Sequence, residues 1–165
     1  MAMSQYQLNI LQLVIDNSKK QYDYRGENYP KTMASICLGE SSAGKEESKN
    51  NFTISDIDYT GKLENASLSI LQIRVPTARY VFKKYHIHTY DKISDHGLAL
   101  LILKDHLLSI DIATKYFILN INRYHKYFTA ISKYNGGTKN VTYVNKVMKN
   151  MKIINKLIKN GKLHL

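Results

Sequence analysis

The sequence has almost none of the residues that cross-link small proteins. Cys37 is the only cysteine among 165 residues, so no disulfide can form within the chain. It lies in an apolar stretch, and no cysteine or histidine stands at the spacing of a metal site. We therefore expect Cys37 to be a small buried hydrophobic residue, and we predict neither a metal nor any other cofactor.

Long apolar runs are also missing. The longest, residues 97–103, is far too short to cross a bilayer. The first nine residues lack a basic region followed by an apolar core, so we expect synthesis in the cytoplasm without an export signal. The chain has two prolines, eight glycines, no internal repeat and 44% hydrophobic residues. These values predict one globular domain over residues 1–165 with a core of its own.

Acidic residues are few relative to basic ones. The formal net charge is +11 and the isoelectric point is about 9.6. Such a charge favours an anionic partner, and nucleic acid, anionic lipid and the bacterial envelope all qualify. The lysines are spread over several segments and no nucleic-acid-binding motif is present, so a non-enzymatic nucleic-acid-binding protein is the weaker alternative.

Helical periodicity dominates the hydrophobic pattern and predicts a mainly α-helical fold. We expect a loop over residues 41–51, a short β-hairpin or irregular flap over residues 52–59, and a helical turn over residues 67–73. The last expected helix is amphipathic and basic; it would close the core and could also contact an anionic surface. The expected helices span residues 4–17, 30–40, 76–85, 94–103, 105–123, 127–134 and 141–159.

One carboxylate stands where an apolar helix meets a polar loop. The stretch from Ile36 to Lys45 reads Ile-Cys-Leu-Gly-Glu-Ser-Ser-Ala-Gly-Lys, and its first acidic residue is Glu40. A glutamate at such a boundary lies half in the core and half in a cleft. Burial raises the pKa of a carboxyl group, so the group can hold a proton near neutral pH and act as a general acid.

Three short motifs in order resemble the soluble lytic transglycosylase and goose-type lysozyme group of the lysozyme-like superfamily. They are Glu40-Ser41, the stretch Ser69-Ile-Leu-Gln72-Ile with Thr-Ala after it, and Tyr134-Asn135-Gly. The resemblance covers about residues 36–144. It implies a single lysozyme-like domain, with a motif-bearing core over about residues 30–145 and a small β-flap beside the cleft. It also implies cleavage of the β-1,4 bond between N-acetylmuramic acid and N-acetylglucosamine in peptidoglycan.

The resemblance assigns roles to the motif residues. Glu40 is implied as the general acid, and the hydroxyl of Tyr134 is implied to reach it. Gln72 and Asn135 are implied to bind sugar, and Ser41 either orients the acid or caps the helix. Ser69 stands where the group has glycine, Leu71 where methionine is usual and Lys133 where alanine is usual. The interval between Glu40 and Gln72 is longer than in the group, which indicates an insertion within residues 45–61.

Whether the site contains a second carboxylate decides between two possible reactions. An inverting hydrolase needs a base that activates water. A lytic transglycosylase needs none, because the 6-hydroxyl of muramic acid attacks within the same sugar and leaves a 1,6-anhydro end. Both reactions remain open, and the candidates for a second carboxylate are Asp56, Asp58 and Glu64.

The resemblance also implies a biological setting. A compact wall-degrading enzyme without an export signal is similar to phage endolysins, which pass through a holin pore from the host cytoplasm to the periplasm or wall. A lysin carried in the virion is the alternative. The implied partners are peptidoglycan strands and the anionic envelope, with no nucleic acid, and we expect a monomer.

Overall fold

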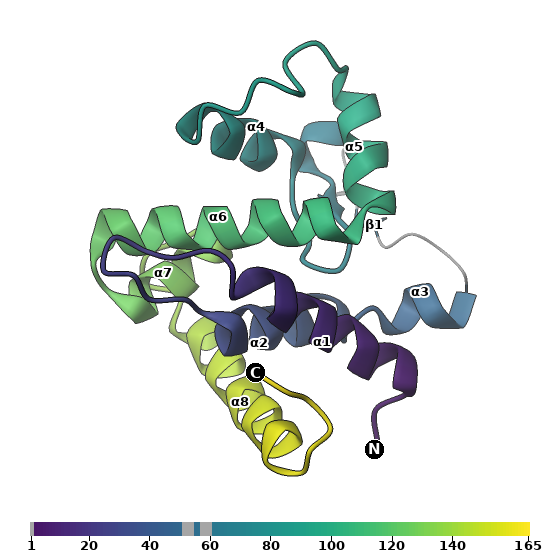
Figure 1. Cartoon of the computed structure of the whole chain (residues 1–165). Coiled ribbons are helices and arrows are strands. Elements are labelled where there is room, and N and C mark those ends of the chain that lie inside the picture. The colour runs from purple at the N-terminus through teal and green to yellow at the C-terminus, as the bar shows by residue number, and fades with distance from the viewer. Residues whose placement is uncertain (1, 51–54, 57–60) are drawn as a thin grey trace.

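Helices arranged around one central helix form the protein in its computed structural model (Figure 1). The structure describes residues 2–50, 55–56 and 61–165, and for residues 48–50 and 55–56 it describes the backbone alone. The mainly α-helical prediction is confirmed. The helices are α1 (Gln5–Ser18), α2 (Pro30–Ser41), α3 (Lys45–Asn50), α4 (Val75–Lys84), α5 (Asp95–Lys104), α6 (His106–Tyr124), α7 (Tyr127–Tyr134) and α8 (Val141–Lys159).

Local sequence signals explain where most helices begin. Ser4 and Gln7 form a reciprocal capping box at the start of α1. Proline occupies the first turn of α2 and of α4, where its missing N–H group has no partner to lose. The carboxylate of Asp105 accepts a hydrogen bond from the Leu108 N–H at 3.1 Å and so starts α6 directly after α5 ends.

Helix α6 lies between two groups of helices. It contacts α1 on one side, α4 and α5 on the other, and α7 near its end (Figure 1). Its buried side chains therefore cover more than one face of the helix. They include Ile110, Ile112, Ala113, Phe117 and Ile121.

The β-structure is small. Strand β1 (Ser55–Asp56) pairs antiparallel with β2 (Ser67–Leu68), and Asp56 stands opposite Ser67. The predicted helical turn over residues 67–73 is wrong. Ser69 and Gln72 have positive φ angles of 69° and 52°, so the chain turns back and Leu68 pairs with Ile73. A short 3-10 helix, Leu63–Asn65, precedes β2.

The predicted loop over residues 41–51 is wrong in its second half, which forms α3. Acidic residues in the first turn favour a helix because they interact with the exposed N–H groups there. Glu46 and Glu47 occupy that turn. Glu47 also accepts a hydrogen bond from the Tyr6 hydroxyl at 2.6 Å and contacts His106 at 2.9 Å, which fixes α3 against α1 and α6.

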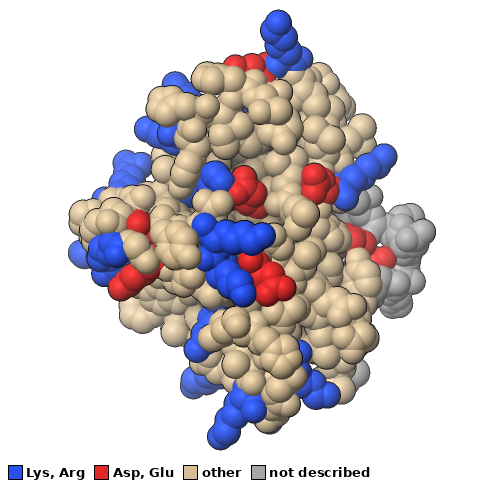
Figure 2. Space-filling model, in the orientation of Figure 1, with Lys and Arg blue, Asp and Glu red and all other residues tan. Residues whose placement is uncertain are grey.

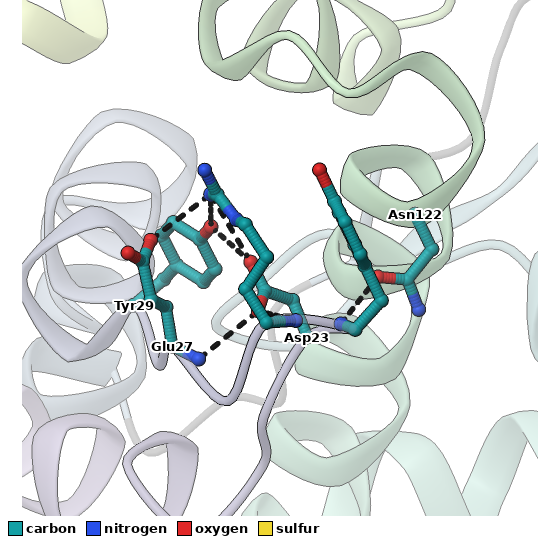
Figure 3. Close-up of polar contacts among 6 residues, drawn as sticks. Asp23, Glu27, Tyr29 and Asn122 are labelled. Atoms are coloured by element: carbon teal, nitrogen blue, oxygen red, sulfur yellow. Dashed lines mark hydrogen bonds and ion pairs between the residues drawn. The ribbon is translucent and has the colours of Figure 1, made fainter.

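A buried carboxylate anchors the loop between α1 and α2 (Figure 3). Asp23 accepts hydrogen bonds from the Tyr29 hydroxyl at 2.6 Å and from the backbone N–H groups of Arg25 and Glu27. Burial raises the pKa of Asp23, but these bonds and the Arg25 guanidinium outweigh burial and hold its pKa at about 2. Asp23 thus stays ionised at ordinary pH. Because Tyr29 directly precedes α2, the network fixes the start of that helix.

No helix within the described residues combines the length and the apolar character that a membrane span requires.

Candidate active site

Glu40 lies one residue before the end of α2, at the edge of the core. The preceding residues of α2, from Thr32 to Cys37, are buried between α1 and α8. Glu40 itself is only partly buried. Glu40 therefore lies between the core and the surface, and it also lines the cavity described below.

A sharp reversal follows Glu40 and carries the chain away from the site. Ser42, Ala43 and Gly44 all have positive φ angles, of 49°, 54° and 75°. A Cβ atom on Gly44 would lie 3.3 Å from Cε1 of Tyr6, so glycine suits both the backbone angle and the space. Ser41 stabilises this turn. Its hydroxyl donates to the Cys37 carbonyl at 3.3 Å and accepts from the Gly44 N–H at 3.1 Å.

Helix α8 supplies the hydrogen-bond partner of the candidate acid. The Tyr143 hydroxyl donates to Oε1 of Glu40 at 2.8 Å. One turn further along α8, Nζ of Lys146 donates to the Gly39 carbonyl at 3.1 Å. Residue 39 is glycine, and a Cβ atom there would lie 3.1 Å from Nδ2 of Asn150, so a larger residue would require the Asn150 side chain to shift.

Two opposing effects set the protonation of Glu40. Burial raises the pKa of its carboxyl group, because a charged carboxylate loses water contacts there. The hydrogen bond from Tyr143 and the positive charge of Lys146 lower the pKa, but they do not cancel the effect of burial. The net result is a raised pKa, which is the property that a general acid needs near neutral pH.

A cavity of about 300 Å³ opens beside Glu40. Five parts of the chain form it: the end of α2, β2 with the turn that follows it (the β2 turn), the start of α4, one face of α6 and the end of α7. Among the described residues that line it, Glu40 is the one carboxylate and Arg74 is the one guanidinium. The other lining residues are Ser67, Gln72, Ile73, Thr77, Ala113, Tyr116, Tyr134, Asn135 and Gly136.

Tyr134 lines the cavity but does not make the contact that the resemblance implies. Its hydroxyl donates to the backbone carbonyl of Leu71 at 2.7 Å, which holds the end of α7 against the β2 turn. The tyrosine that bonds to Glu40 is Tyr143. Burial and the nearby charge of Glu40 raise the pKa of Tyr134 well above its usual value, so it stays a neutral hydrogen-bond donor.

Gln72 and Asn135, which the resemblance implies as sugar-binding residues, both line the cavity. The side-chain amide of Gln72 donates to the Ser69 carbonyl at 2.9 Å, so part of its bonding capacity stabilises its own turn. Asn135 is exposed, and its Oδ1 atom accepts from Nδ2 of Asn140 at 3.0 Å. Ser41, by contrast, is not among the cavity residues.

The three candidates for a second carboxylate differ in position. Glu64 is exposed in the short 3-10 helix and does not line the cavity. Asp56 lies in β1 opposite Ser67, which is a cavity residue, and its side chain lies outside the described part. Asp58 lies outside the described residues altogether.

Several cavity residues are absent from the three sequence motifs. Arg74 directly precedes α4 and Tyr116 comes from α6, whereas Thr77, in the first turn of α4, belongs to the Thr-Ala of the second motif. Helical spacing alone could have identified Tyr143 as a buried residue of α8. It stands four residues before Val147 and eleven before Ile154, so it belongs to the buried stripe of α8. Val144 and Met148, which lie beside this stripe on α8, are only partly buried.

Within the part of the chain that the structure describes, no group of three His, Cys, Asp or Glu side chains is placed to hold a metal ion. Comparison of the chain with protein-family models, curated proteins and solved structures found no match. The function of the site must therefore be inferred from its own chemistry.

Proposed function

We propose that this protein is a glycosidase that cleaves the β-1,4 bond between N-acetylmuramic acid and N-acetylglucosamine in peptidoglycan. The observation that carries the proposal is a partly buried carboxylate, Glu40, which lines a polar cavity and has a raised pKa. A protonated carboxyl group in this position can donate its proton to the glycosidic oxygen as the bond breaks.

The lytic transglycosylase reaction is the first candidate. In that reaction Glu40 protonates the leaving oxygen and the bond from C1 to that oxygen breaks. The 6-hydroxyl of muramic acid then bonds to C1 and returns its proton to Glu40, so one carboxylate acts as acid and then as base. A cavity whose described lining contains a single carboxylate fits this scheme.

A hydrolytic muramidase is the second candidate. Its support is the register of the small sheet, in which Asp56 stands opposite the cavity residue Ser67. A carboxylate on that side could activate a water molecule. Glu64 is a weaker choice for this base because it lies away from the cavity.

One backbone angle adds support to the proposed relationship with soluble lytic transglycosylases. Ser69 occupies the position where that group has glycine, and its φ angle of 69° lies in the region that favours glycine. Its hydroxyl group is buried without a hydrogen-bond partner among the described residues. A backbone angle that favours glycine at residue 69 is consistent with the glycine that the group has at this position.

The positive φ angle of Ser69 leads to a prediction about the stability of two variants. We expect Ser69→Gly to be about 1 kcal/mol more stable than Ser69→Ala, because alanine keeps the strained Cβ and glycine removes it. Both variants remove the unpaired hydroxyl, so the comparison isolates the backbone angle. Chemical denaturation of the two purified variants measures the difference. Equal stabilities would show that residue 69 is not strained.

The biological role follows from the same proposal. We propose a phage lysis protein, made in the host cytoplasm and delivered to the periplasm or wall, which acts there as a monomer. The net charge of +11 would hold it on an anionic wall. A non-enzymatic basic protein that binds glycan or nucleic acid is the alternative from another class.

Mass spectrometry of muropeptides released from purified peptidoglycan tests the proposal. Products with 1,6-anhydromuramic ends, lighter than reducing ends by one water, are expected for the transglycosylase. Reducing muramic acid ends would instead indicate the muramidase, and Asp56→Asn would then be the first variant to test. If the unmodified protein releases nothing from several wall types, the glycosidase proposal is wrong.

A further inference from the structure

The positive charge of this protein is concentrated in its last third. All 13 acidic residues lie at or before Asp111, together with 13 of the 24 basic residues. The 11 remaining basic residues lie after Asp111, where the sequence contains no acidic residue. The chain thus consists of a part with no net charge and a strongly basic part that includes α7 and α8.

Four lysines form a stripe along the exposed side of α8. Lys149, Lys152, Lys156 and Lys159 follow one another at intervals of three, four and three residues, which places them on one face of a helix. All four are exposed, and none makes an ion pair among the residues that the structure describes. Like charges at this spacing repel one another, so the stripe by itself destabilises α8. An anionic surface would remove that repulsion.

Exposed apolar side chains lie beside the stripe. Between α7 and the start of α8 runs a groove of about 370 Å³. Phe128 and Val141 line it and are 57% and 66% exposed. Asn145 and Met148 also line it, and they precede Lys149 and Lys152 by one helical turn. The groove and the lysine stripe therefore form one continuous face, which we call the α7–α8 face. Over the lower part of α8, Figure 2 shows basic residues and no acidic ones.

We propose that the α7–α8 face docks on a membrane surface rich in anionic phospholipids. Lysines attract the headgroups, and apolar side chains beside them enter the boundary between headgroups and acyl chains. Nucleic acid would also attract the lysines, but it offers an exposed aliphatic side chain such as Val141 much less apolar surface than the acyl-chain boundary of a membrane does. The proposal does not depend on glycan cleavage, and it assigns this face a partner different from the substrate of the cavity.

Vesicle binding by the full-length protein tests the proposal. The probes are vesicles that contain phosphatidylglycerol, with pure phosphatidylcholine vesicles as the neutral comparison. The test variant replaces Lys149, Lys152, Lys156 and Lys159 by glutamine. The matched control also introduces glutamine, at four exposed lysines of the part of the chain up to Asp111, which has no net charge. These lysines are Lys20, Lys83, Lys92 and Lys104. Both variants lose four positive charges, so they differ only in where the charge is lost. Circular dichroism checks that each variant is folded.

We expect the stripe variant to lose at least about tenfold in partition coefficient on anionic vesicles, because each lysine near such a surface contributes measurably to binding. The control should lose less than about threefold, the effect of long-range charge alone. Equal losses in the two variants would overturn the proposal, because binding would then reflect total charge. Equal binding to anionic and neutral vesicles, or no binding to either, would overturn it as well.

Substitutions of Phe128 distinguish binding to a membrane from binding to a nucleic acid. Phe128→Leu keeps an apolar side chain and should retain vesicle binding, whereas Phe128→Ser should weaken it. A nucleic acid that stacks on Phe128 would lose affinity with both variants. If single-stranded DNA binds more tightly than anionic vesicles and both variants weaken that binding, the face is a nucleic-acid site and the proposal is wrong. Each assay is repeated with Glu40→Gln, so loss of glycan cleavage cannot be mistaken for loss of docking.

Discussion

The variant Glu40→Gln is expected to cleave peptidoglycan at least about a hundredfold more slowly than the unmodified protein. Glutamine keeps the shape of the side chain and can still accept the hydrogen bond from Tyr143, but it has no proton to donate to the leaving oxygen. General acid catalysis of this kind typically contributes a factor of a hundred to ten thousand. The measurement is the initial rate of muropeptide release from purified wall material.

The matched control for Glu40 is Glu27→Gln, the same chemical change at an exposed site. The Glu27 side chain is 58% exposed and pairs only with Arg25 in the described ion pairs. Exposed ion pairs contribute little stability, so the rate should stay within about twofold of the unmodified protein. If Glu40→Gln retained more than a tenth of the rate, Glu40 would not be the general acid.

The second large effect is expected for Tyr143→Phe, which removes the hydroxyl that donates to Glu40 at 2.8 Å. Hydrogen bonds to charged groups contribute about 1.5–3 kcal/mol, so a ten- to hundredfold loss of rate is expected if the bond also orients the acid. The pH profile gives a second, independent result. Tyr143 stabilises the ionised form of Glu40 and lowers its pKa, so the variant should have a higher Glu40 pKa.

The sign of the pH effect follows from the role of the acid. A general acid works while it is protonated, so activity is present below the pKa of Glu40 and is lost as the pH rises through it. In Tyr143→Phe the alkaline limb of the profile should therefore move to higher pH. Lys146→Gln should move it in the same direction, because the Lys146 charge also lowers that pKa. A shift to lower pH in either variant would contradict this assignment.

Local sequence patterns predicted most helices but not the geometry of the site. Caps and prolines marked helix starts at Ser4, Pro30 and Asp105, because these signals act within one turn. The predicted helical turn over residues 67–73 is not present in the structure. The structure has a β-turn there because Leu68 pairs with Ile73 and with β1, and a pairing with a distant strand leaves no local pattern.

Local sequence patterns also could not predict which tyrosine forms a hydrogen bond with Glu40. Both Tyr134 and Tyr143 lie near the end of α2, and only Tyr134 belongs to a motif that resembles the lytic transglycosylases. Which hydroxyl reaches the carboxylate depends on how closely α8 approaches α2 at Gly39. That approach is a property of two helices far apart in the sequence, so the spacing of residues within one motif cannot predict it.

The bond between Glu40 and Tyr143 also has a consequence for folding kinetics. It joins residues 103 positions apart, and the bond from Tyr134 to Leu71 joins residues 63 positions apart. Contacts between distant residues cost more chain entropy to close than contacts within a helix, so they tend to form late in folding. Helices α1 and α2 are neighbours in the sequence and can pair early, whereas the acid acquires its partner only when α8 docks. During refolding, the helical circular dichroism signal should therefore recover before the cavity beside Glu40 is complete.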